Sequence, residues 1–250
     1  MTPSARMGIG LVGDSPAGAV IAQALAGVGH AVIGRSAPPE DRADHVEALL
    51  PGVPVLEIAD VVRRADMVIL AAEGEALHHI LDQWVSQELS PPGQIVAQVS
   101  IDGNVVALDM LRDKGVITLA LVPLLPLTGH SLDVRRLQGA WCAVVAPTPV
   151  APIGQALAME MGMEALDVPA GNAPALASAI HKATTGVETF IGNALNPLAA
   201  AGIDNAARAL QALLHANIDQ HVREVAGDAD DAWSASDAEI DQLLSDGRHE

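Results

Sequence analysis

Two hydrophobic periods alternate along the first half of the chain. From residue 8 to about 122, short runs rich in Val, Ile and Leu are separated by stretches whose apolar residues recur every three or four positions. The short runs predict β-strands, and the longer stretches predict helices that cover one face of a sheet. The predicted strands cover residues 8–12, 30–34, 53–57, 66–72, 93–99 and 115–121, and the clearest helices cover residues 17–29 and 74–85. This order is typical of a parallel sheet covered by helices.

The pattern first extends this sheet and then becomes purely helical. Residues 140–147 and 163–169 predict two more strands, on either side of a helix at 152–162. After residue 172 the composition is helical, with expected breaks at Asn196-Pro197 and at Gly202. Ser236 and Glu239 match a capping box and predict one last short helix. We therefore predict an α/β fold: a Rossmann-type doubly wound, mainly parallel sheet in residues 1–170, followed by an all-helical C-terminal domain in residues 171–250.

Composition narrows the class of partner. The 250 residues carry a formal charge of −18, and the only lysines are Lys114 and Lys182, so the basic surface that nucleic acid requires is missing. No apolar run reaches the roughly 18 residues that a membrane span needs. Cys142 is the single cysteine and the N-terminus lacks the pattern of a signal peptide, which favours the cytoplasm. The expected partner is a small molecule, and not a nucleic acid or a membrane.

The helical stretch after residue 172 also predicts a protein partner. Most of it is too apolar to be a solvated surface. It must pack on the first domain, on a second copy of the chain, or on both. We favour a homodimer.

The segment GLVGDSPAG, residues 10–18, falls between a predicted strand and a predicted helix. This is the context in which a Gly-x-Gly-x-x-Gly pattern binds a dinucleotide. Gly13 would make the tight turn and Gly18 would let the helix lie close to the strand. Ser15 replaces the middle glycine, and the carboxylate of Asp14 opposes an anion at short range. These two residues predict weak binding of a dinucleotide. The alternative is an ordinary strand-to-helix turn that binds no cofactor.

A second cofactor signal lies at the end of the second predicted strand. A carboxylate at this position would bind the ribose of NAD, but the chain carries Arg35 and Ser36. A cation with a hydroxyl suits the 2′-phosphate of NADP, so NADP is the expected cofactor. The alternative is that Arg35 is a solvated loop arginine.

The order of these motifs resembles a known group of proteins. The run GIGLVGDSPAGAVIAQALAGVGHAVIGRS is followed by ADMVILAAEGEALHHIL, by a strand that ends in Ser100, and by the helical C-terminal part. This order is similar to the 6-phosphogluconate dehydrogenase-like Rossmann proteins. Within that group it is most similar to Rossmann-like proteins with a helical C-terminal domain of unknown function, and to related NADP-dependent oxidoreductases. The resemblance covers residues 8 to about 220.

The resemblance implies a role for several residues at the predicted cleft. Gly13, Ser15 and Gly18 would face the pyrophosphate, and Arg35 with Ser36 would face the adenosine phosphate. Ser100 matches a serine or threonine that is usual at this strand end, where it would serve catalysis. Three positions depart from the group: Glu73 stands where a proline is usual, Ile101 stands for a glycine, and Val122 stands for a histidine.

The resemblance also implies that the helical domain forms the other wall of the cleft. A lysine and an asparagine one helical turn apart often lie there and protonate the substrate. Lys182 and the adjacent His181 fall at about this place, but Gly186 stands where the asparagine would be. A lysine inside an apolar helix is suited to acid–base work, and histidine is a common proton donor, so Lys182 and His181 are the candidates for proton transfer. The alternative is that Lys182 reaches solvent or pairs with an acid.

Other reactive side chains do not form recognisable sites. The pair His78-His79 has no partner at a metal-ligand spacing, so no metal site is expected. Cys142 lies in an apolar run without a neighbouring base, which speaks against a nucleophile. Two hypotheses remain: an NADP-dependent oxidoreductase acting on a small carbonyl or imine, and a non-catalytic binding or scaffold protein with a degenerate cofactor site.

Overall fold

The computed structural model describes residues 6–100 and 105–225. Its centre is a seven-stranded sheet in the order β2-β1-β3-β4-β5-β6-β7. Strands β1 to β5 are parallel, β6 runs antiparallel to β5, and β7 is parallel to β6. The strands are β1 (Gly8–Gly13), β2 (Ala31–Arg35), β3 (Met67–Ala71), β4 (Ile95–Val99), β5 (Ile117–Pro123), β6 (Trp141–Ala146) and β7 (Glu164–Pro169). The predicted Rossmann-type α/β fold is confirmed.

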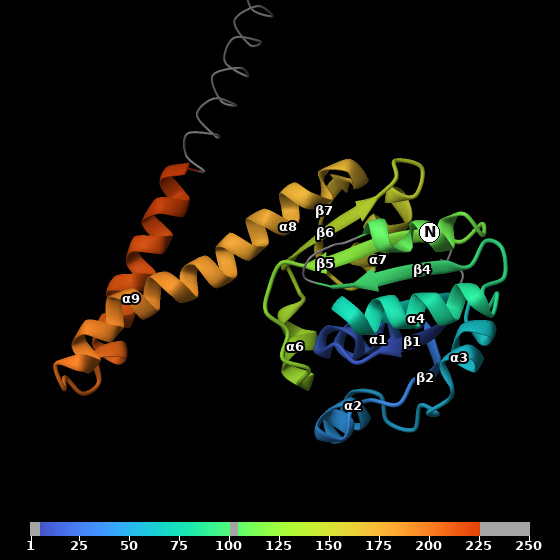
Figure 1. Cartoon of the computed structure of the whole chain (residues 1–250), viewed down its shortest axis with the longest axis horizontal. Helices are drawn as coiled ribbons and strands as arrows, with labels where there is room; N and C mark the ends of the chain where they lie inside the picture. The colour runs from blue at the N-terminus through green and yellow to red at the C-terminus, as the bar shows by residue number, and fades with distance from the viewer. Residues whose placement is uncertain (1–5, 101–104, 226–250) are drawn as a thin grey trace, which may run out of the picture. The chain divides into compact units, whose positions relative to one another are not determined.

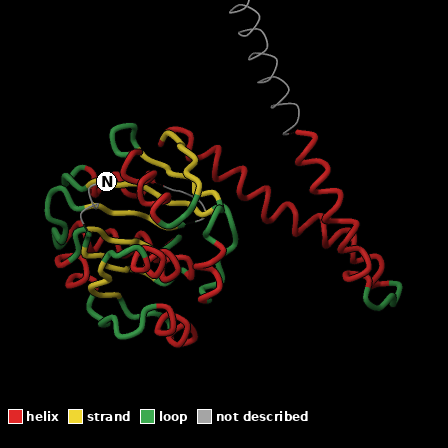
Figure 2. The backbone as a smooth tube through the Cα atoms, turned by 180° about the vertical axis from the view of Figure 1, so that it is seen from behind, coloured by secondary structure: helices red, strands yellow, loops and turns green. Residues whose placement is uncertain are grey.

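Helices cover both faces of this sheet (Figures 1 and 2). The described helices of this part are α1 (Pro16–Gly27), α2 (Ala43–Leu49), α3 (Ile58–Arg64), α4 (Gly74–Ser86), α5 (Asp109–Arg112), α6 (Ser131–Arg136), α7 (Ala151–Glu160) and α8 (Ala173–His181). Alternate residues of each central strand enter different clusters: Ile69 packs with α1, whereas Val68 and Leu70 pack with α3 and α4. Because both faces are buried, the central strands are almost wholly apolar.

Helix α8 covers the end of the sheet farthest from β2. Leu176 and Ile180 of α8 pack against Ala120, Val122 and Val145 on strands β5 and β6. This cluster explains why residues just after the last strand belong with the sheet. Among the described residues, no helix combines the length and the apolar character needed to cross a membrane.

Three predicted features differ from the structure or fall outside it. Residues 53–57 do not form a strand; Val55 makes only an isolated bridge to Arg35. Pro197 does not break the helix, because it lies inside α9 (Val187–Ala200), which ends before Gly202. The predicted capping box at Ser236 lies outside the described residues.

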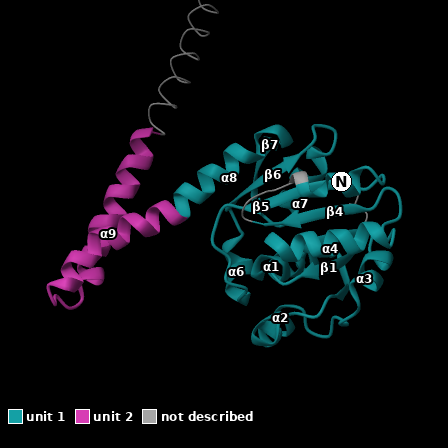
Figure 3. Ribbon diagram, viewed as in Figure 1, with its two compact units in different colours: residues 1–184 teal, residues 185–250 magenta. Residues whose placement is uncertain are grey.

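The chain divides into two compact units, Met1–Thr184 and Thr185–Glu250 (Figure 3). The second unit contains α9 and a helical stretch over residues 206–225, joined by a turn with positive φ at Gly202 and Asn205. None of the residues of α9 is buried. The predicted domain boundary at residue 170 stays a prediction. In the structure α8 packs on the sheet, and the two compact units separate after Thr184.

Candidate functional site

The candidate site lies where the parallel strands end. Strands β1 to β5 run in one direction, so their carboxyl ends share one edge of the sheet. Because β1 lies between β2 and β3, the chain leaves this edge in two directions, which is where such sheets bind ligands. The residues that follow these strand ends include Asp14, Ser36, Glu73 and Ser100.

The turn after β1 depends on two glycines. Gly13 has a φ of 107°, and a Cβ added there would lie 2.3 Å from the carbonyl oxygen of Ala71. A Cβ added at Gly18 would lie 2.3 Å from the Cβ of Ala71, so α1 can lie against β3 only with glycine at this position. These two contacts fix where the N-terminus of α1 meets the sheet edge.

Ser15 occupies the N-cap position of α1. Its backbone N–H donates to the carbonyl oxygen of Ala71 at 2.8 Å, and its side chain makes no capping hydrogen bond. The hydroxyl is therefore not committed to the helix end. The first N–H groups of a helix attract anions, so an anion arriving here would meet both the helix end and this hydroxyl.

Ser36 ties the end of β2 to this turn. Its Oγ accepts a hydrogen bond from the Gly13 N–H at 3.0 Å, and its own N–H donates to the carbonyl oxygen of Leu11 at 2.8 Å. Ser36 thus holds the turn in place while its hydroxyl hydrogen remains able to donate.

Arg35 lies in a different environment from the one that the sequence suggested. Its side chain is only 5% exposed, and Nη2 donates to Oε2 of Glu47 on α2 at 2.8 Å. The segment 54–56 pairs with the Arg35 backbone and covers the outer edge of β2. A hydrogen bond from the Gly52 N–H and this contact with Arg35 hold the pKa of Glu47 below its usual range. Arg35 is thus neither a solvated loop residue nor among the residues that line the cavities at this edge.

Arg42 is the arginine that reaches the turn. Its guanidinium donates to the carbonyl oxygen of Asp14. It lines a cavity of about 250 Å³ together with Ser15, Ser36 and His45. Asp14 and Asp41 line the same cavity, so cationic and anionic side chains meet there. The sequence analysis did not identify Arg42, because it follows two acids in the run EDR and stands seven positions beyond the end of β2.

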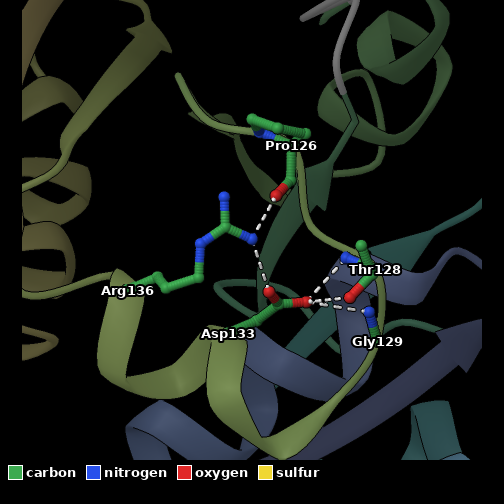
Figure 4. A network of polar contacts seen from close by, with 5 residues as sticks. All are labelled: Pro126, Thr128, Gly129, Asp133 and Arg136. Atoms are coloured by element: carbon green, nitrogen blue, oxygen red, sulfur yellow. Dashed lines mark hydrogen bonds and ion pairs between the residues drawn. The ribbon is translucent and has the colours of Figure 1, made fainter. Parts of the chain in front are cut away.

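The far wall of this cavity comes from the loop after β5, which Asp133 of α6 holds (Figure 4). Asp133 is 1% exposed, and its Oδ2 accepts hydrogen bonds from the Thr128 N–H, the Thr128 hydroxyl and the Gly129 N–H at 2.6–3.0 Å. Arg136 donates from Nη1 to Asp133 Oδ1 at 2.8 Å and to the carbonyl oxygen of Pro126 at 3.0 Å. Burial alone would raise the pKa of Asp133, but the hydrogen bonds outweigh it and hold this pKa below its ordinary value.

This network places the loop beside the start of α1. A Cβ added at Gly129, where φ is 83°, would lie 3.2 Å from the Cβ of Pro16. Thr128 and Gly129 therefore face the turn at Gly13 across the cavity. No sequence motif marks this loop, because its position depends on a carboxylate on the following helix.

A second cavity, of about 200 Å³, adjoins the turn on its other side. Ser15, Glu73, Ser100 and Pro123 are among the residues that line it. Ser100 is 2% exposed, whereas Glu73 is exposed at the N-cap of α4. The structure thus brings together Ser15 and Ser100, which the sequence analysis had selected independently.

The other predicted catalytic residues lie outside these two cavities. His181 ends α8, and Lys182 begins a π-helical turn over Lys182–Gly186; both side chains are exposed in the described chain. The burial from which the proton-transfer role of Lys182 was argued is therefore not present in the chain as described. Cys142 is buried, and burial raises its pKa to about 12, so the reactive thiolate is scarce near neutrality.

Comparison with known proteins agrees with the arrangement of the strands and helices. Residues 2–123 match the Rossmann-like domain family. No curated protein matches the chain in sequence. Among solved structures, a candidate NADP oxidoreductase from Bacteroides fragilis is 15% identical, with a TM-score of 0.66 over 88% of this chain and 80% of that chain.

Two further structures share the fold. An imine reductase from Myxococcus stipitatus in complex with NADP+ is 16% identical, with a TM-score of 0.64 over 87% of this chain and 75% of that one. The 3-hydroxyisobutyrate dehydrogenase of Mycobacterium tuberculosis, solved with L-serine, is 16% identical, with a TM-score of 0.59 over 80% and 68%. At these identities the likeness establishes the fold. The resemblance inferred from the sequence is confirmed at this level.

Proposed function

We propose that the protein is an NADP-dependent oxidoreductase acting on a small carbonyl or imine substrate. The observation that carries this proposal is the turn at Gly13. The positive φ of Gly13 leads the chain from the end of β1 directly into the N-terminus of α1. This arrangement is the one with which Rossmann folds bind a pyrophosphate. The imine reductase solved with NADP+ and the hydroxyisobutyrate dehydrogenase share the fold, and this supports the same class of reaction.

The residues at the sheet edge fit such a cofactor. Gly13, Ser15 and Gly18 would hold the pyrophosphate, since the two glycines allow the close turn and the Ser15 hydroxyl makes no cap bond. Ser36 and Arg42 would hold the adenosine ribose phosphate, because both line the cavity next to the turn. Arg42 takes the role that the sequence analysis gave to Arg35. A guanidinium near a 2′-phosphate favours NADP over NAD.

NADPH, when bound, supplies a hydride to the carbonyl or imine carbon, and the substrate oxygen or nitrogen takes a proton, so that an alcohol or amine and NADP+ are formed. Ser100 lies at the cavity beside Ser15, and its hydroxyl can hydrogen-bond the substrate oxygen or nitrogen there. His181 and Lys182 remain our candidates for the proton donor. Their exposure in a single chain makes this role dependent on what covers α8.

We further propose that the chain works as a homodimer in the cytoplasm. The second unit supports the dimer, because α9 buries none of its residues and exposes Phe190 at 61%. Large exposed apolar surfaces mark association sites. The lone, buried Cys142 suits a reducing compartment.

A non-catalytic binding or scaffold protein is the second candidate. Two observations favour it. The Arg35 guanidinium is paired with Glu47, and the carboxylates of Asp14 and Asp41 line the cavity that we assign to the cofactor phosphate. Hydride transfer from NADPH to a small carbonyl or imine separates the two candidates, since a scaffold leaves NADPH unchanged.

A further inference from the structure

An apolar cavity lies between the segment 123–126, which begins with the last residue of β5, and one side of α8. Its volume is about 510 Å³, within the range of small-molecule sites. Leu124, Leu125, Leu176, Ala179 and Ile180 are among the residues that line it. All of its lining residues belong to the first compact unit.

We propose that this cavity binds the apolar body of the substrate, and that the enzyme selects uncharged, apolar carbonyl or imine compounds over substrates that carry a carboxylate or a phosphate. This inference rests on the proposed oxidoreductase function. It names the class of substrate, which that function leaves open.

The position of the cavity supports the inference. Pro123 and Leu125 line both this cavity and the smaller one that Ser15 and Ser100 line. A compound whose reactive carbon lies near Ser100 would therefore extend its remaining atoms over Pro123 and Leu125. The next surface that those atoms meet is the apolar side of α8.

The charges around the two cavities point the same way. None of the described residues that line either cavity is a lysine, arginine or histidine, and the charged side chain among them is the carboxylate of Glu73. A substrate carboxylate would lose its hydration in the apolar cavity without a cation to replace it.

Thr184 supplies the polar side chain of the apolar cavity. Its hydroxyl donates to the carbonyl oxygens of Ile180 at 2.9 Å and His181 at 3.2 Å, within its own helix. It lies in the π-helical turn Lys182–Gly186, a backbone form that is frequent at functional sites. With its hydrogen used in this way, Thr184 does not change the apolar character of the cavity.

Filling the cavity tests the inference by direct binding. The probe is N-phenylnaphthylamine, an uncharged dye that fluoresces in apolar sites, added to the full-length protein with NADPH present. Ala179→Phe places a ring at the cavity wall, and Ser178→Phe places the same ring at the neighbouring exposed position, which does not line the cavity. Ala183→Phe, one turn along, is a second filling variant. Benzaldehyde and its para-carboxylate analogue serve as competitors.

We expect Ala179→Phe and Ala183→Phe to weaken dye binding roughly tenfold, because the added ring occupies space that the dye would fill. The loss of one methylene-sized contact in an apolar pocket already has an effect of about this size. Ser178→Phe should leave dye binding unchanged. Benzaldehyde should displace the dye at least about tenfold more effectively than the carboxylate analogue, because burial of an unpaired charge is costly. NADPH binding, measured separately, should be the same in all variants. If NADPH does not bind to the wild-type protein, the proposed function is wrong, and the dye measurements still test whether the cavity binds apolar compounds.

Three results would overturn the inference. The first is that the filling variants bind the dye as the Ser178→Phe protein does, which includes the case of no dye binding at all. The second is that the carboxylate analogue competes with the dye as well as benzaldehyde does. Finally, a dimer that dissociates in Ala179→Phe but not in Ser178→Phe would assign the cavity to a second copy of the chain.

Discussion

Two arginines lie near the turn after β1, and they differ in how deeply their side chains are buried. Arg35 is buried and its guanidinium bonds to Glu47, whereas Arg42 is partly exposed and bonds to the Asp14 carbonyl. Two further nitrogens of Arg35, Nε and Nη1, are buried without a hydrogen-bond partner. Arg35 therefore serves the contact between β2 and α2, whereas Arg42 lines the cavity that we propose for the phosphate.

A pair of arginine variants distinguishes these roles. Arg42→Ala should weaken NADPH binding about tenfold or more and leave NADH binding unchanged, since hydrogen bonds to charged groups contribute roughly 1.5–3 kcal/mol. Arg35→Met should retain the preference for NADPH, because its side chain is not among those lining the cavity. Calorimetric titration of both nucleotides measures this. Loss of the preference in Arg35→Met, but not in Arg42→Ala, would restore the assignment made from the sequence.

The sequence identified part of this site for physical reasons that act locally. Gly13 and Gly18 are recognisable because a strand, a tight turn and a helix follow one another within a few residues. The depth of Arg35 depends on α2 and on segment 54–56, which the sequence does not place. Arg42 and Thr128 reach the cavity from separate segments, so no spacing along the chain marks them.

At the scale of elements, the loop after β5 owes its position to one helix. Asp133 accepts three hydrogen bonds from Thr128 and Gly129, and it also binds Arg136 (Figure 4). Asp109 and Arg112 form a similar pair three residues apart, at 2.6 Å, but on the surface. The two pairs differ chiefly in two ways. Asp133 is buried whereas Asp109 is exposed, and Asp133 also holds the loop after β5.

Asp133→Asn should lower the free energy of unfolding by about 1–3 kcal/mol near neutral pH, the cost of weakening hydrogen bonds to a buried charge. Asp109→Asn should change it by less than about 1 kcal/mol. Because folding lowers the pKa of Asp133, its contribution is present above the ordinary pKa of an aspartate and is lost as pH falls through the lower folded value. Urea unfolding at neutral pH and near pH 3 measures both differences. An Asp133→Asn deficit that persists unchanged in acid would contradict this account.

Most elements could be predicted because both hydrophobic periods are strong. Residues 53–57 do not form a strand because Pro54 has no N–H to donate. The backbone hydrogen bonds to β2 come from the Pro54 carbonyl, which accepts, and the Leu56 N–H, which donates. Pro197 was expected to end a helix. It lies inside α9, which continues to Ala200, and the chain turns just beyond that helix, where Gly202 takes a φ of 71°.

At the scale of the whole molecule, the two compact units differ in how they are stabilised. The first unit has three clusters of buried apolar residues. In the second, Phe190, Leu213 and Val222 are each about 60% exposed. The homodimer that we propose would cover this surface, because a second copy offers an identical surface that can pair with it.

Sedimentation at a protein concentration of about ten micromolar should therefore show a dimer. A stable homodimer is fully associated at this concentration. Phe190→Asp combined with Leu213→Asp should shift the protein towards monomer. Val28→Asp, at a position 48% exposed in the first unit, should not. A wild-type monomer would rule out the homodimer.

The central claim is that the sheet edge around Gly13 supports hydride transfer from NADPH. The most direct measurement uses NADPH carrying deuterium at the transferable position of the nicotinamide, in each stereochemical form, with benzaldehyde or a cyclic imine as acceptor. Mass spectrometry of the product should find deuterium on the former carbonyl or imine carbon from one form only, with one NADP+ for each product molecule. If NADPH binds and its deuterium stays in place with both acceptors, the protein is not the oxidoreductase proposed, and the scaffold function takes its place.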